Sequence, residues 1–167
     1  LIKVLSGAYL CDEGEILIKG ARVDIQSPLD ALSRDLRFIY QELNLVQQMD
    51  VARNMFLGME PELVPGLGIV NKRKLYSLAQ EYLSRFHMDL DPRELVENLS
   101  VTQQKMIEIA KALVARVSVL VLDEPTDVLE DQARQELFSI IRRLKDEHEI
   151  GFIYISHRYA EVHQKLF

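Results

Sequence analysis

Two kinds of apolar pattern alternate along the chain. Short, mainly apolar runs with the composition of strands occur at 36–40, 119–122 and 151–155. Other segments carry apolar residues spaced three and four positions apart, which predicts helices with one buried face. These segments are 75–86, 105–115 and 130–147. Strands that alternate with helices favour an α/β fold with a mostly parallel sheet flanked by helices.

Shorter elements are predicted between these segments. Gly7 closes a helix end, Gly20 and Ala21 separate the strands of a β-hairpin, and Ser27 caps a helix whose next residue is proline. The expected bounds are 1–7 for the helix end, 15–19 and 23–25 for the strands, 27–32 and 51–57 for two helices, and a helical turn from Asp91.

Two adjacent carboxylates end the central apolar run. Asp123 and Glu124 follow 119–122, and Pro125 stops the strand because it has no N–H for the ladder. Alternation along a strand predicts that the two acids point to opposite sides. At the carboxyl end of such a strand, one acid can hold Mg²⁺ while the other polarises a water molecule. The alternative is a solvated strand end followed by a turn.

Polar side chains also follow the other two apolar runs. Gln41 comes directly after 36–40, and His157 comes after 151–155 and Ser156. If the three strands are parallel, these residues and the acid pair reach one edge of one sheet, as in a doubly wound nucleotide-binding fold. Taken alone, His157 is better explained as a capping or surface residue.

Ser100 or Thr102 is expected to cap the helix over 105–115. The first N–H groups of that helix and the positive end of its dipole would then be available to an anion, although a plain N-cap explains the same residues. The aromatic residues within 75–86 follow the spacing of a core stripe, which favours packing over a ligand site.

Composition limits the range of functions. The 167 residues, 48% of them apolar, suffice for one core and one domain. A net charge of −6 without a Lys/Arg-rich block argues against nucleic acid or an anionic membrane surface as partner. Cys11 is the only cysteine, so the chain can form no internal disulfide. No apolar run approaches the roughly 20 residues that a membrane-spanning helix needs.

Four motifs, in order, resemble the ATP-binding subunits of ATP-binding cassette (ABC) transporters. They are Tyr-Gln-Glu-Leu-Asn-Leu at 40–45, Leu-Ser-Val-Thr-Gln-Gln at 99–104, the stretch 119–126, and Tyr-Ile-Ser-His at 154–157. The first motif, with Glu-Ile-Ala-Lys-Ala-Leu at 108–113, is most similar to bacterial monosaccharide importers of the ribose, galactose and xylose type. The resemblance extends over essentially the whole chain and implies a partial P-loop-type ABC ATPase domain.

The resemblance implies roles for residues at the sheet edge. Asp123 would hold Mg²⁺, and Glu124 would be the general base that orients the attacking water. Gln41 would approach Mg²⁺ and the water and report to the helical lobe. His157 would lie near the γ-phosphate of ATP, where a donor stabilises developing charge.

The resemblance also implies an assembly. Ser100, Thr102 and Gln103 would contact ATP held by a second ATP-binding cassette. Residues 45–112 would form a helical lobe, and 1–44 with 113–167 a catalytic lobe. Transmembrane permease subunits, fed by a periplasmic sugar-binding protein, would be the partners at the cytoplasmic face of the bacterial inner membrane, with no role for nucleic acid.

Three departures from the family pattern weaken this interpretation. No Gly-x-x-x-x-Gly-Lys-[Ser/Thr] loop occurs, and in relatives that loop directly precedes a segment like 1–7. Thr102 stands where glycine is usual, and Asp127 stands where serine or alanine is usual. The chain by itself is therefore expected not to bind ATP tightly or turn it over, and to expose apolar sheet edges that lower its solubility.

Two other functions compete with the importer subunit. The departures at Thr102 and Asp127 give weight to a non-hydrolysing docking module or a degenerate cassette remnant. A cassette ATPase of translation or DNA repair is disfavoured, because the chain is acidic and has no basic patch.

Overall fold

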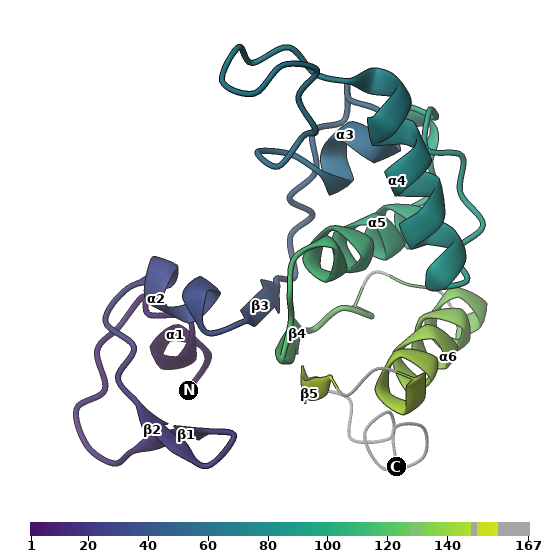
Figure 1. Ribbon diagram of the computed structural model, residues 1–167. Helices are drawn as coiled ribbons and strands as arrows, with labels where there is room; N and C mark the ends of the chain where they lie inside the picture. The colour runs from purple at the N-terminus through teal and green to yellow at the C-terminus, as the bar shows by residue number, and fades with distance from the viewer. Residues whose placement is uncertain (128, 130, 148–149, 157–167) are drawn as a thin grey trace.

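Three parallel strands form the centre of the molecule, for which a computed structural model describes residues 1–127, 129, 131–147 and 150–156 (Figure 1). The strands β3 (Leu36–Ile39), β4 (Val119–Asp123) and β5 (Gly151–Ile155) pair in the order β3-β4-β5. Both pairings are parallel. The central strand β4 carries continuous apolar side chains because it is covered on both faces, as the sequence pattern predicts.

Helices cover this sheet and extend away from it. On one side, α6 (Asp131–Glu147) packs its apolar stripe into the main core. On the other, α5 (Val101–Val114) lies between the sheet and the pair α3 (Val51–Met55) and α4 (Lys72–Arg85) (Figure 1). A short 3₁₀ helix, η1 (Val96–Asn98), leads into α5. One contiguous core joins residues from α3, α4, α5, α6 and the sheet.

The N-terminal residues form a smaller unit beside β3. It consists of α1 (Ile2–Leu5), the antiparallel strands β1 (Ile16–Ile18) and β2 (Ala21–Val23), and α2 (Pro28–Ser33). Gly7 has a φ of 71°, and a Cβ there would lie 2.2 Å from the carbonyl oxygen of Ser27. Only glycine permits this close approach, so the helix end predicted at Gly7 is confirmed.

The hairpin differs from its predicted bounds. Strand β2 begins at Ala21, two residues earlier than expected, and pairs Ala21 with Ile18. Lys19 and Gly20 both have positive φ, at 52° and 77°, which makes a two-residue turn whose twist suits the adjoining strands. The ladder therefore resumes immediately after Gly20.

The turn expected from Asp91 is present, but it does not continue into a longer helix. The chain there makes a single turn, closed by the Glu94 N–H to the Asp91 carbonyl at 3.1 Å. The carbonyls of Pro92 and Glu94 instead accept from the N–H groups of Ala52 and Val51, at 2.9 and 3.0 Å. Because these carbonyls satisfy the unpaired donors at the start of α3, they are not available to continue a helix.

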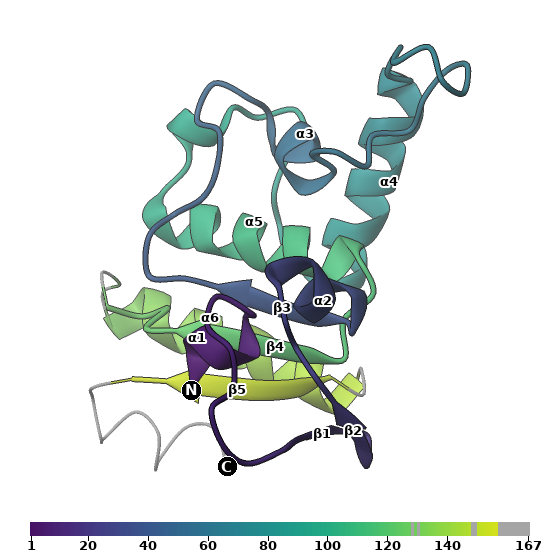
Figure 2. The same ribbon diagram turned by 90° about the vertical axis from the view of Figure 1, so that its left-hand side faces the viewer.

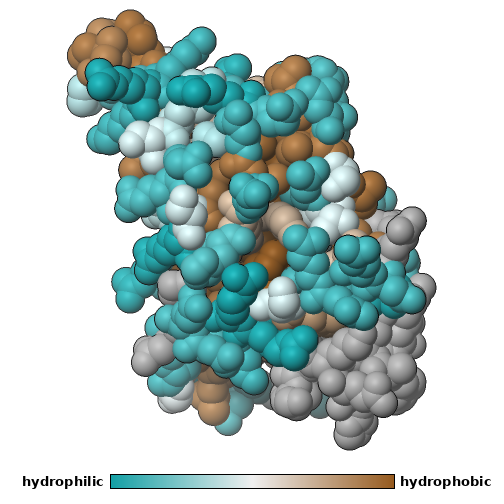
Figure 3. Space-filling model, turned by 90° about the vertical axis from the view of Figure 1, so that its right-hand side faces the viewer, coloured by the Kyte–Doolittle hydropathy of each residue, from teal (hydrophilic) through white to brown (hydrophobic). Residues whose placement is uncertain are grey.

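The loop between α3 and α4 carries apolar side chains into solvent at the end of the molecule far from the sheet (Figure 3, upper corner). They belong to Leu63, Val64, Leu67 and Ile69. Within the described residues, no helix combines the length and apolar character that crossing a bilayer requires.

Candidate functional site

The carboxyl ends of β3, β4 and β5 meet at one edge of the sheet (Figure 2). The register pairs Ile39 with Leu122 and Asp123 with Ile155, so the residues that follow each strand leave the sheet at nearly the same level. Gln41, the acid pair and Ser156 therefore emerge at one edge, as the sequence predicts for parallel strands. His157 lies outside the described residues.

The backbone changes conformation between the two acids, and the opposite placement of their side chains remains a prediction. Asp123 is the last residue of β4 and is half-buried. Glu124 has a φ of 49°, in the left-handed region, while its N–H still donates to the carbonyl of Ile155 at 2.9 Å. The chain thus leaves the strand at Glu124, and the pleat no longer sets the direction of that side chain.

The turn after the acid pair is anchored on both sides. The Asp127 N–H donates to the Glu124 carbonyl at 3.3 Å. Thr126 is buried, and its hydroxyl lies 2.9 Å from the hydroxyl of Tyr154 on β5. The Gln41 side-chain amide donates to the Asp127 carboxylate at 3.2 Å, across 86 residues of sequence. This contact joins the end of β3 to the turn that follows β4.

The candidate site residues at the start of α5 lie together at the N-terminus of that helix. Ser100, and not Thr102, is the N-cap: its hydroxyl accepts from the Gln103 N–H at 3.3 Å, and the Gln103 side chain accepts from the Ser100 N–H at 3.0 Å. This capping box starts α5 at Val101, earlier than predicted. Ser100, Thr102 and Gln103 line a hollow against α6.

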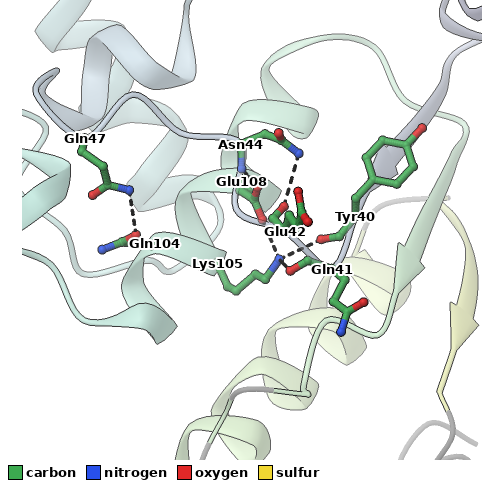
Figure 4. Close-up of polar contacts among 8 residues, drawn as sticks. All are labelled: Tyr40, Gln41, Glu42, Asn44, Gln47, Gln104, Lys105 and Glu108. Carbon is green, nitrogen blue, oxygen red and sulfur yellow. Dashed lines mark hydrogen bonds and ion pairs between the residues drawn. The ribbon is translucent and has the colours of Figure 1, made fainter.

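Two residues that the sequence did not single out hold the segment after β3. Lys105 and Glu108 are buried on α5 and form an ion pair of 2.9 Å. The Lys105 ammonium also donates to the carbonyls of Tyr40 and Gln41 (Figure 4). In the sequence, the two residues are an opposite-charge pair three positions apart in a helix with an apolar face. Such pairs are usually exposed, so the pattern did not predict that this one is buried.

Donors for Mg²⁺ are partly present at the sheet edge. Among the described residues, no group of three or more His, Cys, Asp or Glu side chains could hold a metal ion. Mg²⁺ usually takes one or two carboxylates and completes its shell with phosphate oxygens and water. Asp123 and the amide oxygen of Gln41 fit such a partial set. The sequence contains no glycine-rich loop with lysine that would cradle the phosphates.

The family of the chain follows from its sequence match. Residues 1–127 match the family model described as ABC transporter. The chain belongs to the ABC transporter family. This agrees with the resemblance carried by the four motifs, and with the parallel sheet whose carboxyl edge gathers Gln41, Asp123 and Glu124.

Relatives of this ABC family chain include sugar import proteins. It is 45% identical over 162 residues to a ribose import ATP-binding protein of Rubrobacter xylanophilus, covering 97% of the chain and 32% of that protein. It is 43% identical to a putative ribose/galactose/methyl galactoside import ATP-binding protein of Agrobacterium fabrum, covering 97% and 31%. The chain thus spans about a third of the length of the curated relatives it matches.

Solved ABC cassettes share the fold. A nucleotide-free ATP-binding cassette from an ABC transporter matches with a TM-score of 0.80 at 22% identity, over 98% of this chain and 67% of the other. The ADP conformation of another ABC transporter cassette matches with a TM-score of 0.75 at 21% identity, over 94% and 64%. The predicted α/β cassette fold is confirmed.

Proposed function

We propose that the chain forms part of the ATP-hydrolysing subunit of an ABC transporter that imports a sugar of the ribose or galactose type. The observation that carries this proposal is the parallel register of β3, β4 and β5, which brings Gln41, Asp123 and Glu124 to one edge of the sheet. The relatives named as ribose and galactoside import ATP-binding proteins support a sugar as the cargo.

The residues at the sheet edge divide the chemistry among them. Asp123 and the Gln41 amide oxygen would hold Mg²⁺, and Glu124 would take a proton from the attacking water. His157 would donate to the transferred phosphoryl group. When bound, Mg²⁺ neutralises charge that develops on the phosphate oxygens. The left-handed backbone at Glu124 supports its separate role, because it takes that carboxylate out of the strand pattern that holds Asp123.

The start of α5 would serve a second cassette. In this arrangement Ser100, Thr102 and Gln103 face ATP bound by the opposite subunit, and residues 45–112 form the lobe that docks on the permease. The capping box supports this role, since it keeps the first turn of α5 in a defined geometry. Transmembrane permease subunits at the cytoplasmic face of the inner membrane, supplied by a periplasmic sugar-binding protein, complete the proposed machine.

The test is ATP hydrolysis by the complete gene product that contains these residues. We expect Mg²⁺-dependent turnover that Glu124→Gln lowers by about 10²- to 10⁴-fold, the usual contribution of a positioned general base. Glu81→Gln, which makes the same change at an exposed position on α4, is the matched control and should keep parental activity. Turnover that survives Glu124→Gln would refute the proposed role.

A docking module without hydrolysis is the second candidate, and Asp127 favours it. The Asp127 carboxylate accepts a hydrogen bond from the Gln41 side-chain amide and adds negative charge at the edge where phosphates would bind. For an ATPase, Asp127→Ser should release Gln41 and raise the rate of hydrolysis of the complete gene product. For a docking module, Asp127→Ser and Thr102→Gly should both leave hydrolysis undetectable while binding to the permease persists.

The 167-residue chain by itself is expected to show no turnover. The physical reason is the lack of a glycine-rich loop and its lysine, which would supply the backbone N–H groups and the positive charge that hold the β- and γ-phosphates. Phosphate release from Mg²⁺-ATP is the measurement. Turnover that disappears on Glu124→Gln would overturn this expectation.

A further inference from the structure

Lys105 is a lysine buried within the core of the molecule. Its relative exposure is 1%, which is rare for this residue type unless its charge is paired. The ammonium has three acceptors: the Glu108 carboxylate at 2.9 Å, the Tyr40 carbonyl at 2.9 Å and the Gln41 carbonyl at 3.2 Å. One side chain of α5 therefore binds two successive backbone carbonyls of the segment that leaves β3.

Glu108 binds the same segment from its other oxygen. One carboxylate oxygen of Glu108 accepts a hydrogen bond from the Lys105 ammonium, and the other accepts from the Asn44 N–H at 2.7 Å. The Asn44 side chain closes the segment on itself through the Glu42 carbonyl at 3.2 Å. Figure 4 shows the pair reaching from α5 to both ends of 40–44. The segment is thus fastened at its start by a cation and at its end by an anion.

The arrangement does more than fill space. Two buried charges lose their hydration, and an apolar pair of similar volume would often be at least as stable in a core. An apolar pair, however, cannot accept from Asn44 or donate to the carbonyls of Tyr40 and Gln41. These backbone groups lie beyond the last ladder residue of β3, Ile39, and need partners elsewhere. The ion pair supplies partners and fixes where they lie.

We propose that Lys105 and Glu108 are positioning residues that hold segment 40–44 against α5 and thereby place the Gln41 side chain beside the turn that contains Asp127. The Gln41 carbonyl is held by Lys105, while its side-chain amide reaches Asp127. Because Lys105 on α5 bonds the Gln41 carbonyl, a movement of α5 relative to the sheet also moves Gln41. The importance of Gln41 for hydrolysis rests on the proposed function, but the attachment of segment 40–44 to α5 does not.

Hydrogen exchange of the complete gene product that contains these residues, without nucleotide, tests whether Lys105 and Glu108 hold segment 40–44. Lys105→Met removes the cation at nearly constant length, and we expect exchange of the Asn44 amide to rise by about ten- to a hundredfold. Lys105→Gln keeps an N–H donor and should restore exchange to within about threefold of the parent. The matched control is Lys74→Met, which makes the same change at an exposed position on α4 and should leave exchange at 40–44 unchanged.

The outcome separates positioning from general stability. Faster exchange confined to 40–44 and its neighbours supports the proposal. A uniform rise in exchange over β4, α4 and 40–44 alike, or no rise at Asn44, overturns it. These measurements use no ATP, so they can fail while the Glu124→Gln test succeeds, and the reverse can also occur.

A labelling experiment on the unmutated chain covers the case in which Lys105→Met does not fold. An amine-acetylating reagent followed by mass spectrometry should modify Lys105 at least about a hundredfold more slowly than Lys74, which is exposed on α4. Glu108→Gln should accelerate labelling of Lys105 alone. Equal rates at Lys105 and Lys74 in the folded parent would refute the proposal.

Discussion

Asn54 offers a direct test of how the loop between β3 and α3 is held. It is fully buried on α3, and its side-chain oxygen accepts the Val46 N–H at 2.8 Å. Its amide nitrogen faces the carbonyls of Val46 at 3.0 Å, Asp50 at 3.1 Å and Met49 at 3.3 Å. The three carbonyls also accept backbone N–H groups, from Met49, Asn54 and Val96, so the Val46 N–H depends most on this side chain.

Asn54→Ala should destabilise the fold strongly. Each hydrogen bond contributes about 1 kcal/mol net, and a buried N–H left without a partner adds a cost of about 1–3 kcal/mol. The three carbonyls keep their backbone partners, so we expect a loss of about 3 kcal/mol in the free energy of unfolding. For a chain of this size, that loss lowers the melting temperature by about 6–12 °C.

Urea unfolding followed by circular dichroism measures this change. The midpoint should fall while the slope with denaturant stays unchanged, because the surface exposed on unfolding is nearly the same. Asn98→Ala removes an exposed side chain that donates to the Glu94 carboxylate at 2.6 Å, and it should change stability by no more than about 0.5 kcal/mol. A loss below about 1 kcal/mol for Asn54→Ala would refute the reasoning.

Two further predictions concern α4 and α5. Burial, followed by the 3.0 Å hydrogen bond to Asp50, raises the pKa of Tyr76 above its usual 10.0. A raised folded pKa gives stability that is complete below about pH 10 and lost as pH rises through the folded value. Tyr76→Phe should therefore weaken the alkaline decline of the urea midpoint. Ser100→Ala should cost about 1 kcal/mol by removing the cap of α5, and Ser100→Asp should retain the parental urea midpoint.

Elements set by local pattern were predictable from the sequence. The strands β3, β4 and β5 match mainly apolar runs, and α4 and α6 match helical spacing, because both patterns reflect which side chains a single element can bury. Gly7 as a helix end and Ser27 as a cap followed from the backbone conformations those residues favour. Parallel pairing followed from the alternation of strands and helices.

Features that depend on contacts between distant segments were not predictable. The turn at Asp91 stays outside any helix because its carbonyls are taken by α3, more than 35 residues earlier. Glu124 departs from strand alternation where its N–H bonds β5.

The sequence by itself therefore determined the order of strands and helices and the polar residues that end the strands. Only the tertiary structure decided that Gln41 meets Asp127 and that Lys105 and Glu108 lie buried under segment 40–44. On an isolated helix, a lysine and a glutamate three residues apart would be an exposed pair. Packing of segment 40–44 onto α5 removes them from water, and there they bond the carbonyls of Tyr40 and Gln41 and the N–H of Asn44.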